Sequence, residues 1–258
     1  MFARRFKCEV LENRKLTPTV FALRFKTRKK IRFRAGQFIS VFVPQEGKRK
    51  PARRCYSFAS GPEEKDYLLC VKYVPGGKGS EYLGSLKPGD TFEATAPYGH
   101  FELRDPVPGK GLLFIATGTG IAPILSMIKS IKAKGAFRGP CVVIFGAKNE
   151  QEILFERELR ALGVQSLFAL SSASASWKGF HGRVTTLLRS LPPNFDWQQW
   201  DYYVCGSGEM ISEVGAMLQS LCPKTTIHSE AFSSATKRGP EAPATTTSPL
   251  LRQSDGCA

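Results

Sequence analysis

The sequence lacks a long hydrophobic run, and this limits the class of protein that it can encode. No apolar stretch approaches the roughly 20 residues that a membrane-spanning helix needs, so we expect no membrane insertion. Arg4 and Arg5 make the N-terminus basic, but no apolar segment of the signal-peptide kind follows them. A strand-like pattern begins by about Phe6. We therefore expect neither a secretory signal nor a cleaved mitochondrial transit peptide.

Paired cysteines and clustered histidines are also lacking. The cysteines are odd in number, are scattered and show no C-x-x-C spacing, which argues against a disulfide framework, a zinc site and an iron–sulfur site. The histidines are far apart, so no metal is predicted. Free thiols fit a reducing compartment, and we expect a cytoplasmic protein. The residues concerned are Cys8, Cys55, Cys70, Cys141, Cys205, Cys222 and Cys257, with His100, His181 and His228.

Acidic residues are scarce in the first fifth of the chain. Residues 1–54 hold 17 Lys/Arg against 3 Asp/Glu, a net charge of +14, whereas the rest holds 20 against 19. A nucleic-acid-binding module would explain this excess. However, the stretch has no helix-turn-helix pattern, no zinc ligands and no aromatic RNA-binding strand signature, so we expect no nucleic-acid partner. An acidic protein partner, an anionic cofactor or a simple solvated basic face explains the charge equally well.

The first hundred residues are typical of short strands separated by Gly/Pro turns. Residues at alternate positions are apolar, as in Phe21, Leu23 and Phe25, which is the period of a half-buried strand. Several such strands favour a small antiparallel barrel or sandwich. We predict strands over residues 19–25, 38–43, 67–73 and 91–94.

The pattern changes near residue 105, after which apolar strands alternate with helical segments. Residues 111–116 form a continuous apolar run, as expected for a strand that is buried on both faces. This alternation predicts a parallel sheet with crossover helices. The fold is thus expected to have two domains, residues 1–105 and 106–232, followed by a disordered tail over 233–258. Predicted strands cover 111–116, 141–145, 167–170 and 202–205, and predicted helices cover 123–134, 153–162, 184–189 and 209–221.

Two segments of the first half can meet one planar, phosphorylated ligand. In Arg54–Ser57 the cation can reach a phosphate, the tyrosine ring can stack on a plane, and the serine hydroxyl can touch a ring nitrogen. The glycine-rich segment Pro75–Ser80 precedes a short helix predicted over 81–86, and glycines at a helix start let backbone N–H groups approach an anion. Alone, the glycine turn is typical of an ordinary hairpin loop. Together, the two segments predict a flavin-ring site and a pyrophosphate site.

Two further segments follow predicted parallel strands. Thr117–Pro123 is a dinucleotide-type glycine turn between a strand and a helix, although the usual G-x-G-x-x-G spacing is absent. Cys205–Met210 places a thiol and glycines at another strand end, where ligands of open parallel sheets collect. Taken alone, a buried cysteine with a tight turn would explain this second segment.

The region that selects the cofactor's ribose should follow the third parallel strand. No acid stands between Leu170 and Lys178 to bind a free 2′-hydroxyl, whereas hydroxyls and Lys178 can accept a 2′-phosphate. Lys148 is a second candidate cation, and Ser171 a candidate hydroxyl. These residues favour NADPH over NADH, although a simple flexible loop would have the same composition.

With these motifs in order, the chain resembles the ferredoxin–NADP reductase superfamily, and most of all its compact bacterial ferredoxin or flavodoxin reductases. The resemblance covers roughly residues 6–232. It is carried by Gly36–Phe38, Arg54–Ser57, Pro97–Phe101, Gly118–Pro123, Cys205–Met210 and Glu230–Phe232.

The resemblance implies an FAD-binding barrel followed by an NADP(H)-binding domain. It implies that Arg54 holds the pyrophosphate, Tyr56 flanks the flavin ring, and Ser57 bonds the hydride-accepting nitrogen. Cys205 and Glu230 would lie near the nicotinamide, so the implied catalytic residues are Ser57, Cys205 and Glu230. Further implied flavin-binding residues are Cys55, Val71, Tyr73, Gly77, Gly79, Ser80 and Phe232. Further implied nucleotide-binding residues are Thr117, Gly118, Thr119, Gly120, Pro123, Lys148, Ser171, Lys178, Cys205 and Gly206.

The implied activity is hydride transfer between NADPH and bound FAD, with single electrons passed to or from ferredoxin or flavodoxin. The reductase component of an oxygenase and a free flavin reductase are the near alternatives, and a basic nucleic-acid-binding module is a distant one. The protein is expected to act as a monomer. Some 26 residues follow Phe232, so the resemblance does not identify the group that covers the flavin ring.

Overall fold

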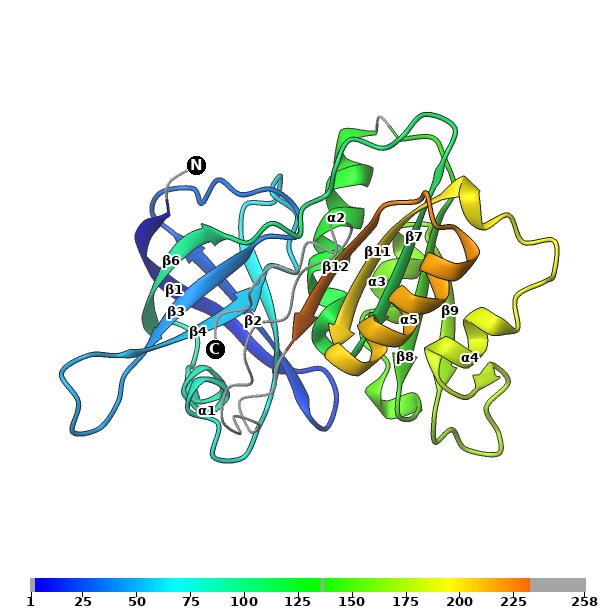
Figure 1. Ribbon diagram of the computed structural model, residues 1–258. Coiled ribbons are helices and arrows are strands. Elements are labelled where there is room, and N and C mark those ends of the chain that lie inside the picture. The colour runs from blue at the N-terminus through cyan, green and yellow to red at the C-terminus, as the bar shows by residue number, and fades with distance from the viewer. Residues whose placement is uncertain (1–2, 136, 233–258) are drawn as a thin grey trace, which may run out of the picture. The chain divides into compact units, whose positions relative to one another are not determined.

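The computed structural model describes residues 3–135 and 137–232, which fall into two compact units (Figure 1). The first unit holds the described residues up to Arg104 together with helix α2, and the second holds residues 105–120 and those from Arg138 to Phe232. The predicted tail over 233–258 lies outside the described residues.

The first unit is built on one six-stranded antiparallel sheet. Its spatial order is β4-β3-β6-β1-β2-β5. The strands are β1 (Arg4–Lys15), β2 (Val20–Thr27), β3 (Phe38–Val43), β4 (Ala52–Ser57), β5 (Tyr67–Lys72) and β6 (Thr91–Tyr98).

This sheet curls until its two edge strands meet. Phe58, directly after β4, forms an antiparallel bridge with Leu69 of β5. Both side chains are fully buried, and the Phe58 ring stacks on Phe33 with the ring centroids 4.1 Å apart. The predicted antiparallel N-terminal domain is confirmed, in the form of a curled half-barrel sheet.

The core of the curled sheet comes from alternate strand residues. Leu23 and Phe25 of β2 are fully buried, as the alternation predicts. Phe25 packs against Tyr67 and Phe92 with ring centroids 5.2 and 5.1 Å away. The Tyr67 hydroxyl accepts a hydrogen bond from the backbone N–H of Ile31 at 2.7 Å, so the basic loop after β2 is tied to this core.

Two helices belong to the first unit. Helix α1 (Lys78–Ser85) begins three residues earlier than predicted, within the glycine-rich segment itself. Helix α2 (Ile121–Lys134) carries serines whose hydroxyls reach the loop after β4. Ser126 Oγ donates to the carbonyl oxygen of Ser60 at 2.7 Å, and Ser130 Oγ donates to Glu63 Oε1 at 2.8 Å. These contacts place α2 in the first unit although it follows the first strand of the second.

The second unit is a six-stranded parallel sheet, as the alternating pattern predicts. Its spatial order is β10-β9-β8-β7-β11-β12, and every neighbouring pair is parallel. The strands are β7 (Gly111–Thr117), β8 (Cys141–Ala147), β9 (Gln165–Leu170), β10 (Phe180–His181), β11 (Trp200–Ser207) and β12 (Ile227–Phe232).

Helices and 3₁₀ turns connect these strands. Residues of α4 and α5 share one core cluster with inward residues of β7 and β11, and Figure 1 shows α5 lying across the sheet. The prediction of a helix over 153–162 was wrong at its start. Phe155 adopts a left-handed conformation (φ 57°) and points inward, so the helix begins only at Glu156. The elements are η1 (Gly118–Gly120), η2 (Glu150–Glu152), α3 (Glu156–Ala161), α4 (Val184–Arg189), η3 (Trp197–Gln199) and α5 (Gly208–Leu221).

Candidate functional site

Strand β4 and the start of helix α1 bring the predicted flavin-binding residues together. Arg54 and Tyr56 stand two positions apart on β4 and so share one face of the sheet. A Cβ atom on Gly79 would lie 2.8 Å from Arg54 Cγ and closer still to Tyr56 Oη. Glycine is therefore required at position 79, because its backbone touches both side chains. This is the arrangement of a cradle for an anion.

The first turn of α1 offers backbone donors to that cradle. The helical hydrogen bonds begin with Glu81 N–H donating to Gly77 O at 2.9 Å, so the N–H groups of residues 78–80 precede them. Gly77 is the N-cap and supplies no side-chain cap. The positive end of the helix dipole adds to these N–H groups, and together they suit a phosphate.

The hydroxyl of Ser80 holds the glycine-rich segment in shape. Ser80 Oγ accepts from Val74 N–H at 3.0 Å and lies 3.1 Å from the Gly77 carbonyl oxygen. Ser80 is buried, and its hydroxyl is used in these contacts within the segment. The backbone of Gly77 is also closely packed, because a Cβ there would lie 2.8 Å from the Val74 carbonyl oxygen.

Tyr56 keeps its proton in this setting. Burial raises the pKa of the phenol to about 12, although the nearby Arg54 cation lowers it. The ring is half-buried and packs against the core of the curled sheet. Ser57 is buried opposite Phe38 of β3, and Cys55 is half-buried. A neutral ring and a small hydroxyl thus follow the arginine along one strand.

Two predicted flavin-binding residues on and after β5 differ in exposure. Val71 is 1% exposed and belongs to the core, so its side chain does not face solvent. Tyr73, just past the strand, is 45% exposed, and its backbone N–H donates to the Thr19 carbonyl oxygen at 2.8 Å. Of these two side chains, only that of Tyr73 is open to a ligand.

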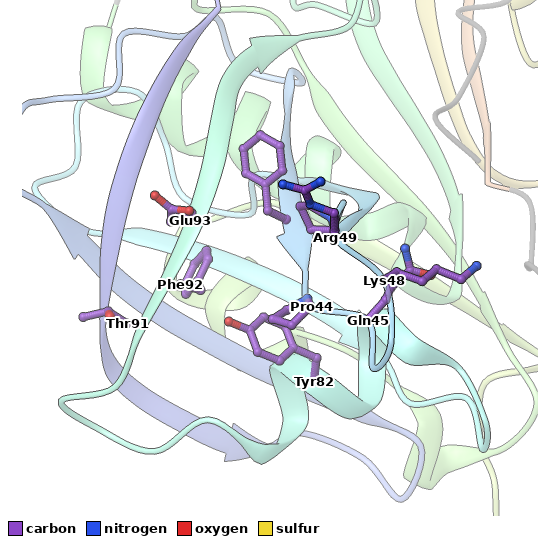
Figure 2. A pocket seen from close by; sticks show the side chains of 10 residues that line it. Pro44, Gln45, Lys48, Arg49, Tyr82, Thr91, Phe92 and Glu93 are labelled. Atoms are coloured by element: carbon purple, nitrogen blue, oxygen red, sulfur yellow. The ribbon is translucent and has the colours of Figure 1, made fainter.

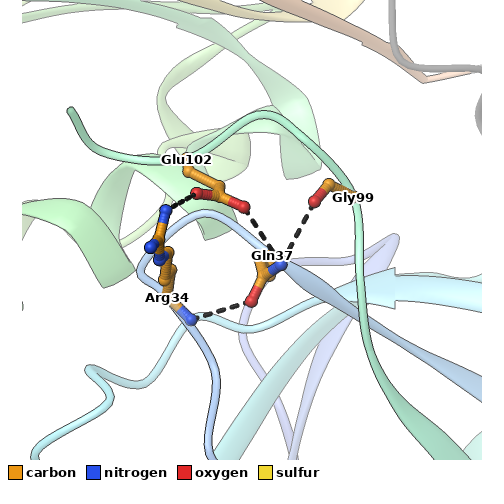
Figure 3. Close-up of polar contacts among 4 residues, drawn as sticks. All are labelled: Arg34, Gln37, Gly99 and Glu102. Carbon is orange, nitrogen blue, oxygen red and sulfur yellow. Dashed lines mark hydrogen bonds and ion pairs between the residues drawn. The ribbon is translucent and has the colours of Figure 1, made fainter. Parts of the chain in front are cut away.

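A polar network joins the loop before β3 to the segment after β6 (Figure 3). Sequence reasoning missed most of its residues. The Gln37 side-chain amide donates to the Gly99 carbonyl oxygen at 3.1 Å and to Glu102 Oε1 at 3.2 Å. Arg34 Nη1 donates to the other oxygen of Glu102 at 2.9 Å. Glu102 is buried, so its two partners compensate the lost hydration of its charge. The network fixes the loop before β3 against the segment after β6.

A cavity of about 310 Å³ borders helix α1 in the same unit (Figure 2). Tyr82, on α1, stands one helical turn after Lys78, whose Nζ donates to Gln45 Oε1 at 3.5 Å. The lining combines aromatic rings with two cations from the loop between β3 and β4, which suits a purine ring and a phosphate. The lining residues are Phe42, Pro44, Gln45, Lys48, Arg49, Pro51, Tyr82, Thr91, Phe92 and Glu93.

In the second unit, the predicted nucleotide-binding residues meet at the carboxyl ends of β7, β11 and β12. Cys205 pairs with Ala116 on one side and with Glu230 on the other. A Cβ on Gly120 would overlap the Cys205 carbonyl, so the turn after β7 lies directly against β11. Phe232 pairs with Ser207 at the end of the same two strands.

Glycines also stand on either side of this edge, Gly118 for its backbone conformation and Gly206 for a close contact. Gly118 adopts φ 53° and Gly206 φ 158°. A Cβ on Gly206 would overlap Thr117 Oγ1, which also accepts a hydrogen bond from Ser207 N–H at 3.4 Å. Thr119 lies in η1. The Pro123 side chain is buried at the third position of α2, where a missing N–H costs no helical hydrogen bond.

Cys205 is a neutral thiol at this edge. Its side chain is fully buried, and burial, with a smaller contribution from the Glu230 carboxylate, raises the pKa of the thiol well above its ordinary value. Glu230 is 2% exposed. Both side chains are therefore closed to solvent, next to the close-packed glycine turns at Gly120 and Gly206.

The loops after β8 and β9 lie together and contain one residue that sequence reasoning missed. Ser172 N–H donates to the Lys148 carbonyl oxygen at 2.7 Å, and Ser171 N–H to that of Ala147 at 3.1 Å. Glu150 Oε1 accepts from Ser174 N–H at 2.9 Å and from Ser174 Oγ at 2.6 Å. No acid stands between Leu170 and Lys178, but Glu150 reaches this segment from the preceding loop. Lys148 and Lys178 are both exposed.

No group of His, Cys, Asp and Glu within residues 3–135 and 137–232 has the arrangement of a metal site. His228 stacks on Tyr203 with ring centroids 4.7 Å apart, and His181 Nε2 lies 3.1 Å from the Trp177 carbonyl oxygen. Within the same residues, no helix is both long and apolar enough to cross a membrane.

Comparison with known proteins assigns both units. Residues 7–103 match the family described as oxidoreductase FAD-binding domain, and residues 114–215 match the oxidoreductase NAD-binding domain. The chain is 33% identical over 244 residues to a ferredoxin–NADP reductase B of Sorangium cellulosum, covering 89% of this chain and 98% of that protein. The chain belongs to the ferredoxin–NADP reductase family. It is an oxidoreductase with an FAD-binding and an NAD-binding domain.

Reductase components of oxygenases are also similar to this member of the family. The chain is 28% identical to the ferredoxin reductase component of a 3-ketosteroid-9-alpha-monooxygenase of Rhodococcus rhodochrous, covering 83% of this chain but only 60% of that protein. A solved ferredoxin NADP⁺ reductase of Neisseria gonorrhoeae with bound FAD and NADP shares the fold, with a TM-score of 0.73 at 22% identity. That similarity covers 85% of this chain and 92% of the other.

Proposed function

We propose that this protein moves a hydride between NADPH and bound FAD and passes single electrons to or from ferredoxin or flavodoxin. The observation that carries the proposal is the close packing of the Gly79 backbone, at the start of α1, against Arg54 and a neutral Tyr56. The similarity to a ferredoxin–NADP reductase over 98% of that relative supports the choice of reaction. The proposed domains are residues 1–105 for FAD and 106–232 for NADP(H).

The chain's residues have distinct roles in this proposal. Arg54 and the first turn of α1 bind the FAD pyrophosphate, Tyr56 packs against the flavin ring, and Ser57 hydrogen-bonds it. Flavin and nicotinamide together supply the hydride chemistry when bound. Cys205 and Glu230 orient the nicotinamide, since a neutral thiol and a carboxyl group at a dry strand end fix a flat ring without a titrating base. The protein's contribution is alignment.

The proposed nucleotide is NADPH. The exposed cations Lys148 and Lys178, with Ser171 between them in sequence, follow the adjacent strands β8 and β9 and can bind a 2′-phosphate. We expect kcat/KM for NADPH to exceed that for NADH by at least tenfold, or about 1.4 kcal/mol. Equal kcat/KM values for NADPH and NADH would reject the proposed preference for NADPH.

The proposed carrier is a small acidic protein. The loop after β2 exposes Arg28, Lys29, Lys30 and Arg32, while Ile31 between them is buried and hydrogen-bonded to Tyr67. Cations on an anchored loop give a positive field that speeds encounter with an anionic partner. We propose that the protein works as a cytoplasmic monomer.

An oxygenase partner is the second candidate, because several relatives are reductase components of oxygenases. Phenol 2-monooxygenase reductase component of Pseudomonas is 32% identical over 233 residues, which span 63% of that protein. In this candidate the chain would pass electrons toward an oxygenase rather than to a general ferredoxin or flavodoxin. Reduction of an oxygenase-associated ferredoxin at a rate well above that of a general ferredoxin or flavodoxin would favour this candidate.

A visible spectrum and an anaerobic titration test the proposed function. Purified protein should retain a yellow flavin spectrum through gel filtration, and NADPH should bleach it before a carrier restores it. Loss of flavin on gel filtration with continued turnover of added free flavin would indicate a flavin reductase instead. A colourless preparation that FAD cannot reconstitute would reject the proposal.

A further inference from the structure

The loop after β8 brings a carboxylate to the region where the nucleotide's ribose is expected. Glu150 Oε1 accepts both the backbone N–H and the hydroxyl of Ser174, at 2.9 and 2.6 Å. The Ser174 hydroxyl also lies 2.9 Å from Ser176 Oγ. Glu150 is therefore held by the very loop whose serines were expected to bind a phosphate.

The sheet places this carboxylate beside the dinucleotide turn. Strand β8 neighbours β7, with Thr117 opposite Gly146, and β9 neighbours β8, with Leu170 opposite Ala147. A pyrophosphate bound at the turn over 118–120 would lie at the same carboxyl edge as the loops that carry Glu150 and Ser174. In parallel sheets of this kind, the residues after the neighbouring strands contact the adenosine ribose.

The chemistry of Glu150 opposes a 2′-phosphate in two ways. Its carboxylate uses the two donors of Ser174 that a phosphate would otherwise accept. It also carries a negative charge, because the Ser174 hydroxyl and backbone N–H lower the pKa of the carboxyl group. A free ribose hydroxyl, in contrast, can donate to a carboxylate oxygen.

We propose that Glu150 is a specificity-determining residue that binds the unphosphorylated ribose and lowers the preference for NADPH that Lys148 and Lys178 create. The inference rests on the proposed use of a nicotinamide nucleotide. It predicts a reductase whose selectivity is a balance of opposite charges, so that NADH is accepted more readily than the cations alone would allow.

The test is Glu150→Gln in the flavin-loaded protein. The substitution keeps the shape and an acceptor oxygen but removes the charge. The ratio of kcat/KM for NADPH to that for NADH should rise at least tenfold, mainly through a lower KM for NADPH, and Glu150→Lys should raise it further. Glu156→Gln is the control, since Glu156 pairs with the exposed Arg160 on α3 at 3.0 Å and should leave the ratio unchanged.

Calorimetry supplies a readout that does not need turnover. The affinity of 2′,5′-ADP should increase at least tenfold in Glu150→Gln, whereas that of 5′-AMP, which lacks the 2′-phosphate, should stay equal or fall. Ratios within twofold of the wild type in both measurements would overturn the inference while leaving the proposed function intact. If neither nucleotide is oxidised but 2′,5′-ADP gains affinity as expected, the proposed activity fails and the role of Glu150 stands.

Discussion

Gly79 lies so close to Tyr56 that no side chain fits between the start of helix α1 and the hydroxyl of the tyrosine. The same glycine touches the stem of Arg54. The stem of an arginine, a neutral phenol and the start of a helix therefore meet at one point of the curled sheet. This convergence makes the site sensitive to a single methyl group.

Replacing Gly79 with alanine should weaken flavin binding. The new Cβ would push α1 away from Arg54 and Tyr56, so FAD affinity should fall at least tenfold, or about 1.4 kcal/mol. Fluorescence titration of the flavin-free protein with FAD measures this affinity. Gly84→Ala on the same helix is the matched control, because its Cβ would meet Phe21 at an ordinary 3.5 Å. If both variants bind FAD as the wild type does, the position of the phosphate site is wrong.

Replacing Tyr82 with alanine should separate FAD from FMN. If the cavity beside α1 holds the adenosine part of FAD, loss of the ring removes a stacking surface that contributes about 1 kcal/mol. FAD affinity should then fall several-fold while FMN affinity stays constant, as measured by titrating the flavin-free protein with each. An equal loss for both flavins would mean that Tyr82 acts through the fold of α1 instead.

Reversing two charges on the loop after β2 should slow the reaction with an acidic carrier. Lys29→Glu combined with Arg32→Glu should raise KM for ferredoxin several-fold at low salt, and the difference should shrink as salt screens the charges. Stopped-flow reduction of ferredoxin at increasing ionic strength measures this. Lys224→Glu, an exposed charge reversal in the second unit, should have little effect. A flat salt response in the wild type would reject electrostatic docking.

Stability should fall at alkaline pH, because buried groups keep their protons only in the folded state. Burial raises the pKa of the Cys8 thiol to about 12, whereas an exposed thiol ionises above about pH 8.5. The stabilisation is therefore complete below that pH and is lost as pH rises, by up to about 1.4 kcal/mol per pH unit for each such group. Urea unfolding at neutral and alkaline pH should give a shallower decline for Cys8→Ala. If the free energy of unfolding fell equally in the wild type and in Cys8→Ala, the raised pKa of Cys8 would be contradicted.

Local sequence patterns were enough to predict both sheets. Alternation in Phe21, Leu23 and Phe25 and the unbroken apolar run of β7 reflect burial on one face and on two, and these need no knowledge of distant residues. Glu150 and Glu102 could not be found in this way. Glu150 contacts Ser174, and Glu102 contacts Arg34 and Gln37. In each case the partners are far apart in sequence, and only the sheet order brings their loops together. The early start of α1 was missed because glycines disfavour helix in isolation.

The bridge between Phe58 and Leu69 has a consequence for self-association. Exposed strand edges are templates on which other chains can add a strand. In the first unit the two edges turn toward each other and are joined at that bridge, and in the second unit one edge is formed by β10, which is only two residues long. Among residues 3–135 and 137–232, no strand pairs with the outer edge of β12, so that edge is the longer of the two templates that this sheet presents.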